Sequence, residues 1–369
     1  MKHTTWLAAM TGVCCLLITL TWTLAVPHQN LGLGADFTAY YGAASALRQS
    51  GGAQIYHLTT IAAFGAKAGC TAITPYAYPP LFAILLIPLT YVPCGAALVL
   101  WDALGAGLLG GSLWVMNRIW PQRLEHFALF CIGALLLAPT WVGFWWGQVH
   151  ALVLFALVWA LWRVERDDYL GAGIALALIS WIQVIPGLLV VYLALRHKWK
   201  AVATTLVTGA LLLVAMVGVV GVPGLLNWVS SISGVARFGD QPSNISPAHL
   251  LGGWIVVPIV LVYLFASQKG TFAQGYLWTI STMLALSPLA YDFYLLWLLP
   301  AGFALWGSTR RRAALFALIA VMDVAVYAVR PLMAAIIVGA WCAQGWQMVR
   351  AAMPVGARQS DPAAETRAG

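Results

Sequence analysis

Long apolar stretches separated by short polar breaks run along the whole chain. Most of them approach the roughly 20 residues that an α-helix needs to cross the hydrocarbon core of a bilayer. The pattern therefore predicts an all-α polytopic membrane protein with about twelve transmembrane helices. The predicted spans are 6–26, 94–117, 126–144, 148–162, 169–183, 186–195, 201–220, 250–267, 272–287, 292–307, 313–329 and 331–349.

Two apolar regions do not fit ordinary spans. Residues 80–93 are too short, so we expect a re-entrant or juxtamembrane helix on the outer face. Residues 169–195 can make only two short helices, which meet at an apex from Gln183 to Pro186. Helices that end within the membrane leave backbone groups without partners, and such groups usually indicate a cavity.

The composition supports the same class. Hydrophobic residues make up 62% of the chain and charged residues only 8%, which excludes an ordinary soluble globular protein. No stretch has the composition of a separate soluble domain. We expect one integral membrane domain, 1–350, and a disordered cytoplasmic tail, 351–369, with membrane lipids and no nucleic acid as partners. The segment after Lys2 is expected to remain as the first span, because no signal-peptide cleavage site follows it.

The basic residues orient the predicted helices. With the N-terminus inside, fifteen of the nineteen Lys and Arg residues fall on the inner side, as the positive-inside rule requires. Only Arg48, Lys67, Arg237 and Arg330 fall outside. The pattern predicts a multi-pass protein of the inner (plasma) membrane with both termini in the cytoplasm.

Polar residues of interest gather at the outer ends of the predicted spans. Polar residues with unrelated structural roles would be expected on both sides of the membrane, so we expect one extracytoplasmic site built from several loops. Its candidates are Asp36, Tyr40, Tyr41, Tyr78, Gly147, Gln148, Gln183, Asn244, Ser287, Pro288 and Asp292.

Simpler roles compete with a functional one. Asp36 and Asp292 each precede a predicted helix, so a role as an N-cap alone is the simpler alternative for both. Asp102 and Asp323 lie within spans, where an ionisable group is costly and is either functional or a hydrogen-bonded structural residue. The histidines lack metal-ligand spacing and no acidic cluster suggests a divalent ion, so we expect no metal and no cofactor.

The order of these motifs resembles glycosyltransferase family 87, a polyprenyl-phosphate-sugar-dependent group of the GT-C membrane glycosyltransferases. The resemblance runs from Asp36 to about Pro300. It rests on Asp36 with Tyr40-Tyr41, Tyr78-Pro79-Pro80-Leu81-Phe82 with Pro88, Gly147-Gln148, the segment from Gly171 to Pro186 with the basic turn at Arg196, and Ser287-Pro288.

The resemblance implies a GT-C-type bundle and a function. Such enzymes transfer a hexose, often mannose, from a polyprenyl-phosphate donor to a glycolipid or glycan hydroxyl at the outer face, with inversion. Asp36 matches the acidic position of the family and is the expected catalytic base. The expected substrate-binding residues are Tyr40, Tyr41, Tyr78, Gln148, His150, Gln183, Arg237, Asn244, Asp292 and Arg330.

This chain departs from the family pattern near the apex. Gln183 stands where members often carry Lys, so a cation for the donor phosphate is missing there. We expect Arg48, Arg237 or Arg330 to supply it. His150 follows Gly147-Gln148 where the family has Asn, and Tyr291 to Tyr294 replace a His-rich end.

A transporter or flippase is the main alternative, because many spans, broken helices and intramembrane Asp residues also occur in carriers. The chain shows no convincing internal repeat, which weighs against a carrier. A structural membrane scaffold is a weaker option.

The cysteines give one further expectation. The topology places Cys70 and Cys94 on the outer side, where a disulfide can form, and Cys14, Cys15, Cys131 and Cys342 within spans. We therefore expect a bridge between Cys70 and Cys94.

Overall fold

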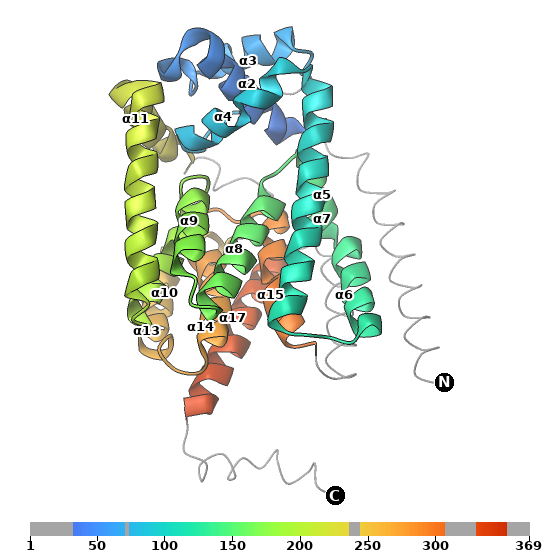
Figure 1. Ribbon diagram of the computed structural model, residues 1–369, viewed down its shortest axis with the longest axis vertical. Coiled ribbons are helices and arrows are strands. Elements are labelled where there is room, and N and C mark those ends of the chain that lie inside the picture. The colour runs from blue at the N-terminus through green and yellow to red at the C-terminus, as the bar shows by residue number, and fades with distance from the viewer. Residues whose placement is uncertain (1–31, 71–73, 236–243, 307–329, 353–369) are drawn as a thin grey trace, which may run out of the picture.

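The computed structural model describes residues 32–70, 74–235, 244–306 and 330–352 (Figure 1). Within these ranges the chain forms helices and no strand, as predicted. The elements are α2 (Ala35–Ser50), η2 (Gly52–Gln54), α3 (Leu58–Lys67), α4 (Pro80–Leu86), η3 (Ile87–Tyr91), α5 (Cys94–Ile119), α6 (Leu124–Leu136), α7 (Ala138–Trp146), α8 (His150–Glu165), α9 (Tyr169–Ser180), η4 (Ile185–Gly187), α10 (Leu188–Leu195), α11 (Trp199–Val235), α12 (Pro247–Leu250), η6 (Gly253–Ile255), α13 (Val256–Ala266), α14 (Phe272–Leu286), η7 (Asp292–Leu298), α15 (Leu299–Ala304) and α17 (Arg330–Ala352).

Three helices are long and apolar enough to cross a membrane, namely Cys94–Ile119, Trp199–Ile232 and Pro331–Arg350. The pair α6 and α7 makes a fourth if it counts as one bent span. The other apolar helices are shorter, so the described helices indicate a membrane protein without confirming twelve spans. The predicted spans 6–26 and 313–329 lie outside the described residues.

The predicted span 126–144 is not one straight helix. It breaks at Leu137 and bends by 50° between α6 and α7. Pro139 has no N–H and its ring blocks the carbonyl one turn before it, so the helical hydrogen-bond ladder stops there. Two freed carbonyls accept side-chain bonds instead: Thr140 Oγ1 donates to Ala134 at 2.8 Å, and Trp141 Nε1 donates to Leu135.

The predicted end of the span at 220 coincides with a kink in α11. Gly221 has non-helical backbone angles, with a φ of 69°, and divides Trp199–Val235 into two helical parts. The sequence does not predict the second part, which carries Pro223 near its start. The kink lies against η2: a Cβ on Gly52 would fall 2.2 Å from the Cα of Val220. Asn227 Nδ2 also donates to the Ala53 carbonyl at 3.0 Å.

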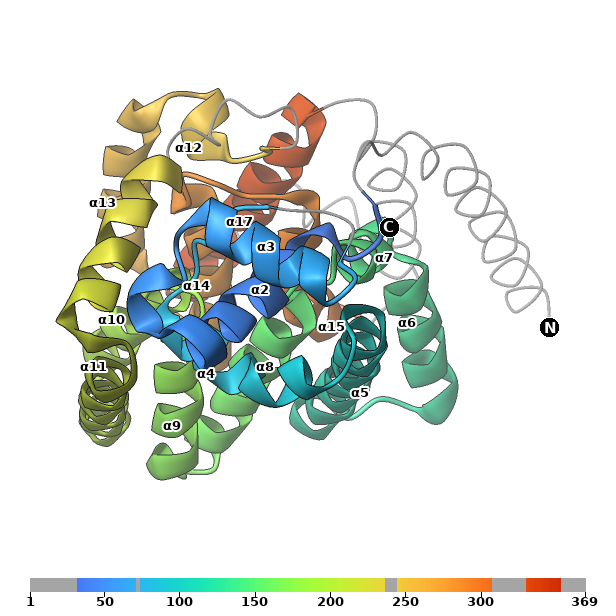
Figure 2. The same ribbon diagram turned by 90° about the horizontal axis from the view of Figure 1, so that it is seen from above.

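Helices α2, α3 and α4 form a layer at one end of the molecule, across the ends of the longer helices (Figures 1 and 2). Helix α2 is the centre of this layer and is buried along most of its length. Gly42 allows the close approach of α3, since a Cβ there would lie 2.7 Å from the Ile61 carbonyl oxygen. The short helix predicted for 80–93 is present as α4 and η3, which pack against α2.

Basic turns lie at the opposite end of the molecule (Figure 1). Arg196 Nη1 donates to the Gln268 carbonyl at 2.8 Å, and Lys198 Nζ lies 3.8 Å from Asp167 Oδ1. These bonds bring together the turns after α8, α10 and α13. In the described part of the chain, the basic turns and the α2–α4 layer thus lie at opposite ends, as predicted. Which end faces the cytoplasm stays a prediction.

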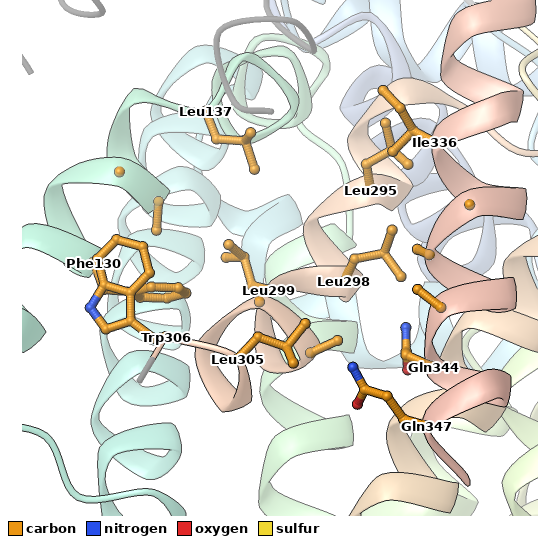
Figure 3. A pocket seen from close by; sticks show the side chains of 17 residues that line it. Phe130, Leu137, Leu295, Leu298, Leu299, Leu305, Trp306, Ile336, Gln344 and Gln347 are labelled. Carbon is orange, nitrogen blue, oxygen red and sulfur yellow. The ribbon is translucent and has the colours of Figure 1, made fainter. Parts of the chain in front are cut away.

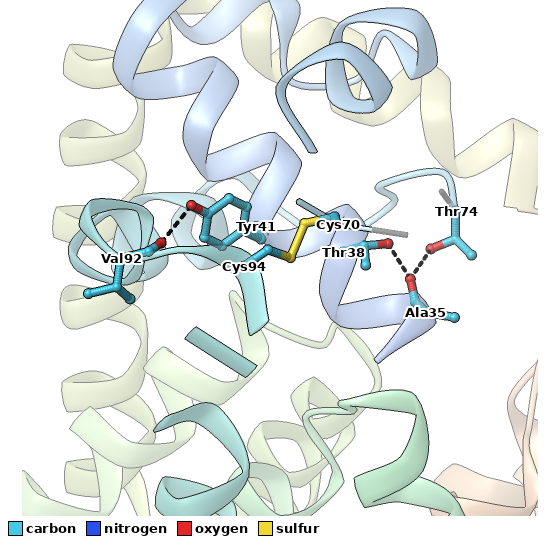
Figure 4. The surroundings of a disulfide bond; sticks show 7 residues. All are labelled: Ala35, Thr38, Tyr41, Cys70, Thr74, Val92 and Cys94. Carbon is cyan, nitrogen blue, oxygen red and sulfur yellow. Dashed lines mark hydrogen bonds between the residues drawn. A yellow bond between two sulfur atoms is a disulfide. The ribbon is translucent and has the colours of Figure 1, made fainter. Parts of the chain in front are cut away.

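A disulfide joins Cys70, just beyond α3, to Cys94, the first residue of α5 (Figure 4). Their Cα atoms are 5.5 Å apart, which suits an unstrained bridge. The predicted pairing is confirmed. Beside it, the Tyr41 hydroxyl donates to the Val92 carbonyl at 2.8 Å, so the bridge and this bond fix the start of α5 against α2.

The number of cysteines labelled with and without reductant should reveal the Cys70–Cys94 bridge. The unfolded protein without reductant should bind two fewer maleimide labels than the reduced protein, and Cys70→Ser should abolish the difference. The variant should also lose about 3 kcal/mol of stability, because the bridge restricts the unfolded chain. Cys131→Ser, which removes a free thiol, is the matched control. Equal labelling before and after reduction would contradict the bridge.

Candidate active site

Asp36 lies in the first turn of α2 and turns its carboxylate toward another segment of the chain. The N-cap of α2 is Gly34, with a φ of 72°, and no side chain caps this helix. Asp36 therefore is not the cap residue. The Gly34 N–H donates to the Trp145 carbonyl at 2.7 Å, which fixes the start of α2 against the end of α7.

Gln148 is the partner of Asp36. Its Nε2 donates to Asp36 Oδ2, although 112 residues separate the two positions. Gln148 follows Gly147, whose φ of 67° ends α7 in the left-handed region that favours glycine. A Cβ on Gly147 would lie 2.5 Å from the Phe37 Cβ, so this glycine also lets the turn approach α2.

Two tyrosines surround the amide oxygen of Gln148. The hydroxyl of Tyr40, one turn after Asp36 in α2, donates to Oε1 at 2.9 Å, and the hydroxyl of Tyr78 donates to the same atom at 3.1 Å. The two hydroxyls are 3.1 Å apart. Tyr78 is fixed in turn by Tyr56, whose hydroxyl donates to the Tyr78 carbonyl at 2.9 Å. Four segments thus contribute to one hydrogen-bonded network: α2, the residues before α3, the segment at Tyr78 and the turn at Gln148.

The apex between α9 and η4 adds a fifth segment. Gln183 is buried there, and its Nε2 donates to the Tyr294 hydroxyl at 3.3 Å. The Tyr294 ring stacks on Trp297 with centroids 4.6 Å apart. The sequence did not single out Tyr294 as a site residue. Its place in the aromatic run after Ser287-Pro288 was the available signal.

Burial sets the protonation of this cluster. It raises the pKa of Asp36 to about 6, while hydrogen bonds from Gln148 and Thr74 act in the opposite direction. Burial also keeps the pKa values of Tyr40 and Tyr78 well above the ordinary phenol value. A carboxylate that titrates near neutrality, surrounded by uncharged donors, is suited to act as a general base.

Comparisons with known proteins show which family the chain belongs to. The sequence profile of glycosyltransferase family 87 matches residues 76–299, more than half of the chain. The chain belongs to glycosyltransferase family 87. This confirms the predicted family, which is a family of glycosyltransferases. The matched range contains Tyr78, Gln148 and Gln183, and Asp36 precedes it.

Two similar proteins are polyprenol-phosphate-mannose-dependent alpha-(1-2)-phosphatidylinositol pentamannoside mannosyltransferases. The one from Mycobacterium tuberculosis is 28% identical over 193 residues, which cover 51% of this chain and 42% of that protein. The one from Mycolicibacterium smegmatis is 26% identical over 321 residues, which cover 80% of this chain and 74% of that protein. No solved structure matches this chain.

Tyr41 and His150 do not reach the Asp36 carboxylate in this family 87 structure. The Tyr41 hydroxyl donates to the Val92 backbone. The His150 side chain is buried, and its ring packs so closely on α7 that a Cβ on Gly143 would lie 2.2 Å from it. Direct substrate contact by these two residues stays a prediction.

Asn244 holds a loop together. Its Oδ1 accepts from the N–H of Ser246 at 3.0 Å and from the N–H of Ala290 at 3.1 Å, and its Nδ2 donates to the Pro288 carbonyl at 3.3 Å. These bonds fix the loop that leads into η7. Asp292 begins η7, and its Oδ1 accepts from the Phe293 N–H at 2.8 Å. Both residues support the position of Tyr294.

Among the described side chains, no cation of the expected kind contacts this cluster. Arg48 is twelve residues after Asp36 in α2, about 18 Å along a helix, and its guanidinium lies over the Tyr91 ring. Arg237 lies outside the described residues. Arg330 is the first residue of α17, and its side chain is not described.

A cavity of about 390 Å³ lies between α6, α15 and α17 (Figure 3). Its lining is almost entirely apolar, with Gln344 and Gln347 among the few polar side chains. None of Asp36, Gln148 and Gln183 lines it, so this cavity is separate from the carboxylate cluster.

We expect Asn244→Ala to destabilise the protein. It leaves the N–H groups of Ser246 and Ala290 buried without this acceptor, at a cost of about 1–3 kcal/mol for each group. Thermal unfolding of the purified protein measures the loss. Asn227→Ala is the matched control, because its amide donates one exposed bond to a carbonyl and its loss should stay below about 1 kcal/mol. Equal melting temperatures for the two variants would contradict the role of Asn244.

Proposed function

We propose that this protein is an inverting glycosyltransferase that moves a hexose, with mannose as first candidate, from a polyprenyl-phosphate donor to a hydroxyl of a glycolipid or glycan. Both relatives are named for a polyprenol-phosphate-mannose donor and a phosphatidylinositol pentamannoside acceptor. The aligned regions cover 42% and 74% of those proteins, so donor, acceptor and linkage belong to the proposal.

The hydrogen-bonded carboxylate of Asp36 carries the proposal. An acceptor hydroxyl has to lose its proton as its oxygen attacks the sugar carbon, and Asp36 is the carboxylate that Gln148 holds at the centre of the cluster, with a pKa raised by burial to about 6. The bond between that carbon and the phosphate oxygen breaks, and its electron pair leaves with the polyprenyl phosphate. One attack from the side opposite the phosphate inverts the anomeric carbon.

No general acid is needed, because the leaving group is already an anion. Its growing charge requires hydrogen-bond donors or cations instead. Gln183, which donates to Tyr294, is one candidate donor beside the site. Arg237 and Arg330 are the proposed cations, and Asp292 is the proposed second contact to acceptor or donor. Tyr40, Tyr41, Tyr78, Gln148, His150 and Asn244 complete the set taken from the sequence.

The proposal includes the place of the site in the membrane. The cluster lies beside the α2–α4 layer, away from the basic turns, as an extracytoplasmic site in the inner membrane requires. A GT-C-type bundle of about twelve helices, formed by residues 1–350, is part of the same proposal. Family membership favours a transferase over a carrier.

Asp36→Asn tests the proposed base. Asn keeps the size of the side chain and an oxygen that can accept from Gln148, so the variant should insert and melt as the wild type does. It should nevertheless lose about a hundredfold or more in rate, the usual scale of general base catalysis. The assay follows transfer of labelled hexose from a polyprenyl-phosphate donor to a glycolipid acceptor. Asp292→Asn should lose less. A near wild-type rate for Asp36→Asn would remove the base from the proposal.

Replacing the proposed cations tests the phosphate contact. Arg237→Gln or Arg330→Gln should lower kcat/KM by roughly 10-fold to 150-fold, since a charge-assisted contact contributes about 1.5–3 kcal/mol. Arg48→Gln is the control, because Arg48 lies at the far end of α2 over Tyr91. If both variants keep the full rate, another group binds the phosphate.

A further inference from the structure

The amide of Gln148 has one orientation that satisfies all its neighbours. Two phenol hydroxyls donate to Oε1, at 2.9 Å from Tyr40 and at 3.1 Å from Tyr78, and they use both lone pairs of that oxygen. The NH₂ group must then point the other way, toward Asp36 Oδ2. Gln148 is only 9% exposed, so water is poorly placed to replace these partners.

We propose that Gln148 is a positioning residue for Asp36, and that Tyr40 and Tyr78 act jointly to keep its amide turned so that it donates to the carboxylate. This inference rests on the proposed function. It gives the two tyrosines a role different from sugar binding: they act through Gln148. The amide and Thr74 use part of the roughly four acceptor positions of the Asp36 carboxylate, and the rest remain for the proton of the acceptor hydroxyl.

The two tyrosines act jointly because of what happens if the Gln148 side-chain amide turns by 180°. If the amide turned round, its NH₂ group would replace Oε1 as the partner of both phenols, and Oε1 would face Asp36. An ionised carboxylate repels that oxygen, whereas a protonated carboxyl can donate to it. The phenols therefore disfavour the protonated form of Asp36 by holding the amide. A phenol can also accept from the NH₂ group, so what opposes the reversal is a phenol O–H that would lose its acceptor Oε1. Either phenol alone leaves one such O–H, so loss of both should cost more than the two single losses combined.

The pH dependence should report the same effect. The base works only when ionised, so kcat/KM of the wild type should rise with pH through an acidic limb near 6, where Asp36 titrates. The hydrogen bond from Gln148 lowers this pKa, so its loss should move the limb upward. The titratable groups that interact with Asp36 are Tyr40 in α2, Tyr78 before α4, and Tyr291 and Tyr294 at the start of η7. Asp292 interacts with Tyr291.

The test measures kcat/KM between pH 5 and 8 for the full-length protein. Tyr40→Phe and Tyr78→Phe keep the rings and should each lose less than about fivefold. The double variant should fall at least about tenfold below the product of the single effects, a coupling within the range of contacting residues. Its acidic limb should shift upward, as should that of Gln148→Leu. The same limb should persist in an Asp292→Asn background, which assigns it to Asp36.

Tyr192→Phe is the matched control. Tyr192 is a buried phenol whose hydroxyl donates to the Phe272 carbonyl at 2.6 Å, near the basic turns. Its loss should change neither the rate nor the limb. If Gln148→Leu does not fold, the double tyrosine variant decides the question, because both rings remain in place.

Two failures are distinguishable. In the first, the wild type transfers sugar and Asp36→Asn does not, but the rate loss of the double tyrosine variant equals the product of the two single losses and its acidic limb does not shift. The positioning role is then wrong and the proposed function stands. If the wild type transfers no sugar, or Asp36→Asn keeps its rate, the proposed function fails and this inference fails with it.

Discussion

The hydrogen bond between Gln148 and Asp36 is the interaction on which the site depends. A partly buried carboxylate needs donors, because burial without them strongly disfavours its charge. Here the donor comes from a turn far along the chain, and that turn is fixed by two glycines. Gly34 bonds to the end of α7, and Gly147 approaches α2 so closely that no side chain would fit. The contact between α2 and α7 therefore determines where the base can lie.

Broken helices supply most of the polar residues near this bond. Gln148 follows the end of α7, Gln183 lies between α9 and η4, and Tyr294 lies in a 3₁₀ segment. Each break leaves backbone N–H and C=O groups that the apolar surroundings cannot hydrogen-bond, so side chains hydrogen-bond to them instead. Trp101 Nε1, for example, donates to the Gly147 carbonyl at 2.9 Å. The same breaks that interrupt the spans thus make room for a polar site.

The described cluster is built from uncharged donors around one acid, while cations gather at the other end of the molecule. Gln183 stands where family members often carry Lys, and its amide bonds to a phenol. An uncharged apex leaves the charge of a bound phosphate to be balanced from elsewhere. We therefore expect this chain to differ from members with a lysine mainly in the group that balances the charge of the phosphate.

The sequence by itself determined the helical class, the sidedness of basic residues, the Cys70–Cys94 pair and the candidates Asp36, Tyr40, Tyr78, Gln148 and Gln183, because hydrophobic length, charge and motif order are local properties. It did not determine the bend at Leu137, the second helical part of α11 after Gly221, or the separate roles of neighbours such as Tyr40 and Tyr41. Tyr40 reaches Gln148 while Tyr41 bonds to Val92, since adjacent helical residues point in different directions. Only the packing of α2 against α4, α5 and α7 decides which of them lies beside the carboxylate.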